Sequence, residues 1–182
     1  DHMVTTESLV RYARLLKQAV SHPVTFCENY VPWLDKLKPL AEELDVISIH
    51  TYPVWEYKTI EEGLAYTIEN YNAVAQAYPD KQIIITEAGW ATKTNGQGID
   101  SHNVNQQFQK RYYQELMAWA EKEQVLVYYF EAFDENWKGS DDPLEPEKHW
   151  GMNKSDLRVT LIYKSDSLDK LTQMRFRTCF EH

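Results

Sequence analysis

The chain has 182 residues, 43% of them hydrophobic, which suits one domain with a substantial core. Its formal net charge of −9 argues against nucleic acid or an anionic membrane as partner, because both bind basic surfaces. No apolar run approaches the roughly 20 residues of a membrane span, and two cysteines form neither a disulfide framework nor a metal signature.

Helical and extended segments alternate along the chain. In chain order we predict a helix at residues 5–21, a strand at 23–28, a helix at 33–44 broken near Pro39, a strand at 46–50, a helix at 59–78, a strand at 82–87, a helix at 103–122 and a strand at 125–130. Thr6 is the candidate N-cap of the first helix, and Thr59 with Glu62 forms a capping-box pattern. Cys27 is expected to be a small buried residue. Strands alternating with helices over short connections predict an α/β fold with a parallel sheet.

The strand at residues 82–87 ends on a carboxylate. Three consecutive isoleucines before it are typical of a strand buried on both faces of a parallel sheet. Glu87 ends the strand and is followed by Gly89 and Trp90. Ligands bind at the C-terminal ends of parallel strands, and a carboxylate beside an indole ring suits a sugar site. From this segment alone, the alternative is that Glu87 caps the next helix.

Two further strand ends carry similar residues. Residues 128–139 read Tyr-Tyr-Phe-Glu-Ala-Phe-Asp-Glu-Asn-Trp-Lys-Gly, an aromatic strand that runs into a carboxylate-rich loop, and residues 147–151 read Glu-Lys-His-Trp-Gly. After the strand at residues 46–50, residues 50–55 read His-Thr-Tyr-Pro-Val-Trp. In this order the motifs resemble those of family 17 glycoside hydrolases, the β-1,3-glucan-cleaving (β/α)8 barrels.

The resemblance extends from about Glu7 to Gly151. It implies a partial TIM barrel made of approximately the last four βα units, within residues 1–152, and a tail of unknown structure at residues 153–182. The family's acid/base glutamate, which ends the fourth strand in an Asn-Glu pair, would lie just upstream of Asp1. We therefore expect a fragment that carries the nucleophile half of the site.

The resemblance also implies roles for the charged residues. Glu87 matches the nucleophile of a retaining glycosidase, in which a second carboxyl protonates the leaving oxygen. Lys138 is the candidate for a positive charge near Glu87, although it could be a solvated loop residue. Glu135 and Glu147 match glutamates that line the cleft, orient the lysine and bind sugar hydroxyls. Glu28 also ends a strand. That strand corresponds to the fifth strand of the family's barrel, not the fourth, and Glu28 follows a cysteine instead of an asparagine, so it is a weak substitute for the acid.

Aromatic and polar residues near the same strand ends are candidates for binding substrate. The hydroxyl of Tyr52 could donate to Glu87 or to sugar, or the ring could only pack the barrel mouth. His50 could donate to the site or cap its strand. Any of three tryptophans could be a sugar platform or a core residue, and we expect at least one to face the cleft: Trp55, Trp90 and Trp137. The histidines show no ligand-like spacing, so we expect no metal and no cofactor.

Two interpretations of function stay open. In the first, the parent protein is a hydrolase acting on β-1,3-glucan, or a glucanosyltransferase using the same covalent intermediate, and this chain alone is inactive or very weak. In the second, the chain is a non-catalytic module that binds β-glucan or assembles. Four βα units leave two strand edges unpaired, so we expect a homodimer or higher self-association. The chain does not begin with a signal peptide. The localisation is therefore an open question, and a secreted or periplasmic parent enzyme is one of the alternatives.

Overall fold

The computed structural model describes residues 4–152, so the predicted tail at residues 153–182 lies outside the described residues. Four parallel strands form one sheet in the order β1-β2-β3-β4, which is also their order in the chain. The strands are β1 (Cys27–Asn29), β2 (Val46–Thr51), β3 (Gln82–Ala88) and β4 (Val127–Tyr129). Sequential parallel strands connected through helices are the arrangement of a (β/α)8 barrel, so the expected partial barrel is confirmed.

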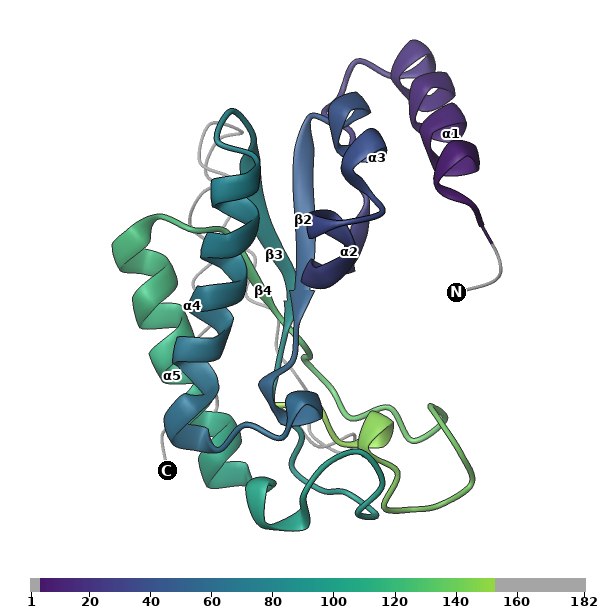
Figure 1. Ribbon diagram of the computed structural model, residues 1–182. Coiled ribbons are helices and arrows are strands. Elements are labelled where there is room, and N and C mark those ends of the chain that lie inside the picture. The colour runs from purple at the N-terminus through teal and green to yellow at the C-terminus, as the bar shows by residue number, and fades with distance from the viewer. Residues whose placement is uncertain (1–3, 153–182) are drawn as a thin grey trace, which may run out of the picture.

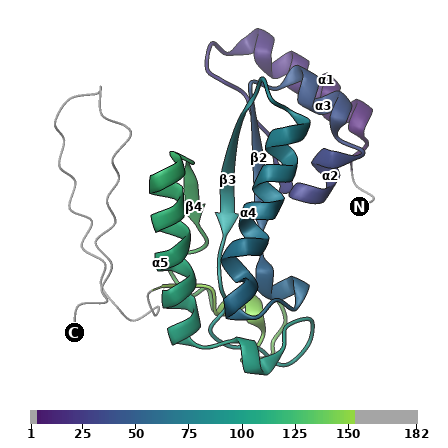
Figure 2. The ribbon, with the colours of Figure 1, turned by 60° about the vertical axis from the view of Figure 1, so that its left-hand side comes forward.

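Helices connect the strands and cover the sheet, except for the first helix, which precedes β1 and packs against the third helix (Figures 1 and 2). They are α1 (Thr6–Ala19), α2 (Tyr30–Leu34), α3 (Lys38–Glu43), α4 (Ile60–Ala77) and α5 (Gln106–Glu123), with short 3-10 turns η1 (Pro53–Glu56), η2 (Ser101–Asn103) and η3 (Pro146–Lys148). Helix α4 packs against β2 and β3, α5 packs against β4, and the two helices contact each other. No helix in residues 4–152 is long and apolar enough to cross a membrane.

The helix ends differ in detail from the sequence prediction. The capping box of Thr59 and Glu62 is present at the start of α4. Thr5, not Thr6, caps α1, because its side chain accepts a hydrogen bond from the backbone of Ser8. The break expected near Pro39 lies before it, between α2 and α3, and Pro39 occupies the first turn of α3, where a missing N–H costs nothing.

The core lies between the sheet and the helices. Its largest fully buried side chains include those of Trp33, Trp90, Trp150 and Tyr112, with isoleucines from β2 and β3. Cys27 is exposed, which corrects the expectation that it is buried. It opens β1, an edge strand of the described sheet, so it has a neighbouring strand on one side only.

The segments that follow the strands gather at one edge of the sheet, at the bottom of Figure 1. They are η1 after β2, the loop with η2 after β3, and the long loop with η3 after β4. A β-bulge adjusts this edge. Ile49 pairs with Ile85, but the next residue, His50, pairs with Glu87, so Thr86 is the extra residue. Bulges commonly redirect side chains near functional sites, and this one sets His50 opposite Glu87.

Candidate active site

Glu87 stands at the C-terminal end of β3 and receives two contacts on one oxygen. The hydroxyl of Tyr52 donates a short hydrogen bond to Oε2 of Glu87. Nδ1 of His50 lies 3.3 Å from the same oxygen. The Glu87 side chain retains 33% of its exposure. Both described contacts fall on Oε2, which leaves Oε1 as the oxygen available to a substrate.

Tyr52 is held by aromatic rings on the inner side of the site. Its ring makes edge-to-face contacts with Phe130, at 5.7 Å between centroids, and with Trp150, at 5.0 Å. Burial raises the pKa of Tyr52, and the hydrogen bond and negative charge of Glu87 raise it further, with smaller contributions from Glu147 and Glu131. The phenol therefore keeps its proton and acts as a donor. The charges of all three carboxyl groups act on this phenol.

Lys138 lies on the loop after β4. We expected its charge to lie near Glu87, but its direct partners are two other carboxylates. Its Nζ is 3.0 Å from Oε2 of Glu131 and forms a second ion pair with Glu135. It also lies 4.6 Å from the ring centroid of Phe130. Burial opposes its charge, but the two carboxylates outweigh this and raise the pKa of Lys138. Among residues 4–152 no ion pair joins Lys138 to Glu87, so the direct contacts of the proposed nucleophile come from Tyr52 and His50.

Glu131 is a site residue that the sequence analysis missed. It lies two residues after β4, its side chain is 16% exposed, and its Oε1 is buried without a hydrogen-bond partner within the described part of the chain. Burial raises its pKa to about 7, the Lys138 ion pair opposes this, and the charge of Glu135 adds to the increase. The signal was present in the sequence, because Glu131 is the first carboxylate after a strand, as Glu87 is at the end of β3.

Glu147 on η3 joins the same group of charges. Burial raises the pKa of Glu147, the charge of Lys138 lowers it, and the charge of Glu87 adds to the increase. The structure thus brings together residues that are up to 97 positions apart, His50 and Glu147. Four of the expected site residues, Glu87, Glu135, Glu147 and Lys138, lie at this edge of the sheet with Tyr52.

The three candidate tryptophans have different environments. Trp90 is completely buried, packs against Tyr112 and donates its indole N–H to the backbone oxygen of Asn103 at 2.7 Å, so it is a core residue and not a sugar platform. Trp55 is half-buried and stacks at a tilt on the buried Trp150. Trp137 is 76% exposed and lies on the loop of Lys138. Of the three rings, only that of Trp137 is broadly accessible.

Glu28 makes a local contact within its own strand. Its Oε1 accepts a hydrogen bond from the backbone N–H of the next residue, Asn29, at 2.8 Å. Within residues 4–152, Glu28 makes no hydrogen bond or ion pair with Glu87, Lys138 or Tyr52. The described residues also contain no group of three or more His, Cys, Asp or Glu side chains placed to hold a metal ion.

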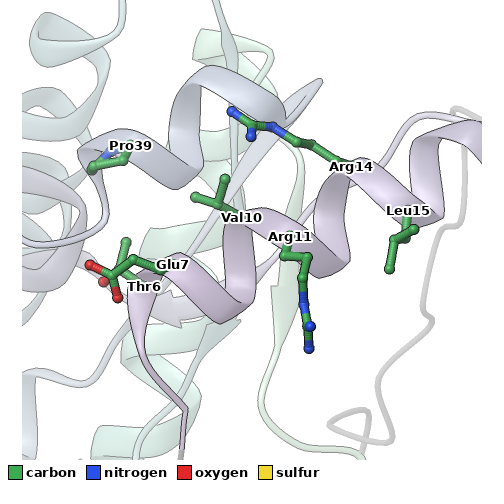
Figure 3. Close-up of a pocket in the computed structure, with 7 residues that line it drawn as sticks. All are labelled: Thr6, Glu7, Val10, Arg11, Arg14, Leu15 and Pro39. Carbon is green, nitrogen blue, oxygen red and sulfur yellow. The ribbon is translucent and has the colours of Figure 1, made fainter.

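A cavity of about 420 Å³ lies elsewhere, beside α1 (Figure 3). It is lined by Thr6, Glu7, Val10, Arg11, Arg14, Leu15 and Pro39. Figures 1 and 2 place α1 and α3 beside the edge where the strands begin, away from the loops that carry the carboxylates. This cavity is therefore separate from the candidate active site.

A family model decides the assignment of the chain. The model of the BtgE/BtgC glycoside hydrolase domain matches residues 2–151. The chain belongs to this family. A glucan 1,3-beta-glucosidase from Arthroderma benhamiae is 28% identical over an alignment of 123 residues, which covers 59% of this chain and 38% of that protein.

The BtgE/BtgC domain also resembles solved structures. An active-site mutant of the Rhizomucor miehei beta-1,3-glucanosyltransferase with laminaritriose superposes with a TM-score of 0.74 at 24% identity. A second structure, described as the glycoside hydrolase family 17 beta-1,3-glucanosyltransferase from Rhizomucor miehei, gives 0.71 at 25% identity. Each covers 84% of this chain and 55% of the matched chain. The resemblance to family 17 enzymes is confirmed, and the chain spans about half of their length.

Proposed function

We propose that this domain carries the nucleophile half of a retaining glycosidase site for β-1,3-glucan, and that the parent protein belongs to glycoside hydrolase family 17. The observation that carries the proposal is the setting of Glu87. It ends a parallel strand, is oriented by Tyr52 and His50, and shares its edge of the sheet with Glu131, Glu147 and Lys138. The β-1,3-glucan names of the similar proteins support this substrate class.

In the proposed reaction, Oε1 of Glu87 attacks the anomeric carbon of a glucosyl unit. The bond from that carbon to the leaving oxygen breaks, and a second carboxyl group supplies the proton that this oxygen gains. Tyr52 and His50 hold Oε2 and so fix the direction from which the other oxygen attacks. Trp137, the most exposed of the candidate tryptophans, would present an apolar face to sugar C–H groups.

The covalent intermediate has two possible acceptors. Water would complete hydrolysis, and the hydroxyl of another glucan chain would complete transfer, with the same roles for Glu87 and Tyr52. We propose that the general acid of the complete site is not Glu28, because Glu28 is bound to the backbone of its own strand. In line with the family resemblance, we propose that this acid is a carboxyl group from outside residues 4–152.

A non-catalytic β-glucan-binding module is the second candidate function. It is favoured by the exposure of Trp137, combined with the lack of any hydrogen bond or ion pair from Glu28 to Glu87 or Lys138 within residues 4–152. The two functions differ in covalent chemistry at Glu87. A binding module would hold glucan without forming a glycosyl bond to this residue.

The test uses an activated 2-deoxy-2-fluoro-glucoside, which does not need a general acid and whose covalent intermediate is released slowly. The full chain should acquire a glucosyl adduct on the peptide that contains Glu87, detected by mass spectrometry after digestion. Glu87→Gln should remove the adduct, because an amide is a poor nucleophile. Glu115→Gln, a change at an exposed ion pair on α5, should leave it unchanged. Labelling that persists in Glu87→Gln would refute this residue as the nucleophile.

Binding separates the second candidate from the first. Laminarihexaose should bind to the wild type and to Glu87→Gln with similar affinity, measured by calorimetry. Binding without labelling would favour the non-catalytic module. Labelling of Glu87 together with binding would favour the enzyme. Neither labelling nor binding would refute a glucan site in this chain.

A further inference from the structure

Lys138 has more donors than its described partners use. A lysine ammonium carries three N–H groups. One serves Oε2 of Glu131 and one serves Glu135. The lysine side chain remains 22% exposed, and its Nζ lies over the face of Phe130. One donor is therefore left for a group that enters the site from solvent.

The two carboxylates hold this ammonium from different parts of the fold. Glu131 lies two residues after β4, and Phe130 between them is tied to β3 by the hydrogen bond from its N–H to the Ala88 carbonyl at 2.9 Å. Glu135 comes from the loop that also carries Lys138. Glu131, whose neighbour Phe130 is bonded to β3, thus connects the loop lysine to the sheet. Without Glu131, the only described charge partner of Lys138 would move with its own loop.

Glu131 is kept in this position at a cost. One of its oxygens is buried and unpartnered among the described residues, and such an atom costs about 1–3 kcal/mol. Lys138 satisfies the other oxygen. A buried polar group without a partner requires an explanation. The loop does not need a buried carboxylate beside Lys138 in order to fold, so stability alone does not explain Glu131.

The ion pair is also adjacent to the nucleophile. Lys138 lies over Phe130, and Phe130 contacts the ring of Tyr52, whose hydroxyl binds Glu87. The charge of Glu87 raises the pKa of Tyr52, and the charge of Glu131 adds a smaller contribution. One aromatic ring therefore separates the ammonium from the phenol that orients Glu87.

We propose that Glu131 is a positioning residue, which together with Glu135 fixes Lys138 so that its third donor binds a hydroxyl of a β-1,3-linked glucan beside Glu87. The proposal rests on the proposed function and adds a residue to it. Glu131 touches Lys138 and not the sugar. Its effect on the glucan is transmitted by the ammonium.

The proposal has a pH dependence with a definite sign. The pKa of Glu131 is raised to about 7, so this carboxyl takes up a proton as the pH falls through neutrality and its ion pair with Lys138 weakens. The charged or titratable groups around it are Lys138 and Glu135 on the loop, Tyr52 after β2 and Glu147 on η3. Glucan affinity should therefore rise with pH from about 5.5 to about 8.

The first experiment measures laminarihexaose binding to the full chain by calorimetry. Glu131→Gln should bind about tenfold more weakly than wild type at about pH 8, and within about threefold of it at about pH 5.5, where the wild-type carboxyl is already protonated. Glu115→Gln should match the wild type at both values. Circular dichroism confirms that each variant is folded. Equal binding by Glu131→Gln and wild type at about pH 8 would overturn the proposal and leave the proposed function intact.

A double-mutant cycle tests whether Glu131 acts through Lys138. In a Lys138→Met background, adding Glu131→Gln should change the affinity by less than about twofold, because the residue to be positioned is gone. A loss in the double variant that equals the product of the two single losses would mean that Glu131 acts independently. That result would overturn the positioning role.

A last measurement does not depend on sugar. In chain labelled at the lysine ε-carbons, the Lys138 resonance, assigned with Lys138→Met, should shift near pH 7 as Glu131 titrates, and Glu131→Gln should abolish this step. If the Lys138 resonance of the wild type does not shift near pH 7, the proposed contact between Glu131 and Lys138 is wrong. If the step is present but laminarihexaose does not bind, the contact stands while the proposed function and the sugar-binding role of Lys138 fail.

Discussion

Gly89→Ala is the sharpest test of how β3 and β4 are joined beneath the site. A Cβ at Gly89 would lie 1.9 Å from the carbonyl oxygen of Phe130 and 3.2 Å from the ring of Trp150. An ordinary contact needs about 3.4 Å, so the backbone of β4 would have to retreat by about 1.5 Å. The obstacle is a carbonyl group and not the end of a flexible side chain. The strain therefore has to be taken up by the strands themselves.

The expected loss of stability can be worked from this geometry. Overpacking of this kind costs about 1–3 kcal/mol, and weakening the bond from Phe130 N–H to Ala88 adds about 1 kcal/mol. Alanine recovers about 0.4–1 kcal/mol by restricting the unfolded chain. The net loss should be about 1–3.6 kcal/mol. Because Glu131 follows Phe130 in the chain, the same shift should also weaken laminarihexaose binding.

Gly96→Ala is the matched control. Gly96 has φ +85°, but a Cβ there would meet nothing within 4 Å. The loss of stability in Gly96→Ala should come only from placing alanine in a left-handed backbone conformation, which costs about 1–2 kcal/mol. The gain from restricting the unfolded chain again offsets about 0.4–1 kcal/mol of this. Urea unfolding followed by tryptophan fluorescence measures both variants. If Gly89→Ala lost no more stability than Gly96→Ala, the close approach of β3 and β4 would be wrong.

Three further predictions follow from burial, titration and exposed apolar surface. Trp90→Ala should lose about 3–5 kcal/mol of stability. Trp137→Ala should change stability by less than about 0.5 kcal/mol and should weaken glucan binding. Equal losses of stability in the two variants would contradict the burial assigned to these side chains. Burial raises the pKa of Glu131 from 4.5 to about 7, so the folded chain binds a proton that the unfolded chain releases. Stability should fall as pH rises through this window, by at most about 1.4 kcal/mol per pH unit, and Glu131→Gln should lack this part of the slope in urea unfolding. The chain should self-associate through the exposed face of α1, and Leu15→Glu with Leu16→Glu should shift light scattering towards monomer; a wild-type monomer at micromolar concentration would contradict this.

Much of the fold could be predicted from local pattern. The alternation of helix and strand, the capping box at Thr59 and the position of Glu87 at a strand end follow from hydrophobic periodicity and side-chain chemistry within short segments. The bounds of two strands differ from the prediction. The strands predicted at residues 23–28 and 125–130 are Cys27–Asn29 and Val127–Tyr129 in the structure. Pairing with a neighbour decides where a strand ends, and a single segment does not contain that information.

The sequence by itself determined which residue types stand at the ends of the strands, and therefore that carboxylates and aromatic rings meet at one edge of the sheet. Only the tertiary structure decided their partners. Trp90 is buried because Gly63 of α4 and Tyr112 of α5 enclose it, and Lys138 pairs with Glu131 because the loop after β4 folds back onto its own strand. The physical reason is that burial and ion pairing are set by distances between segments that are remote in sequence, whereas periodicity and capping act within a few residues of the chain.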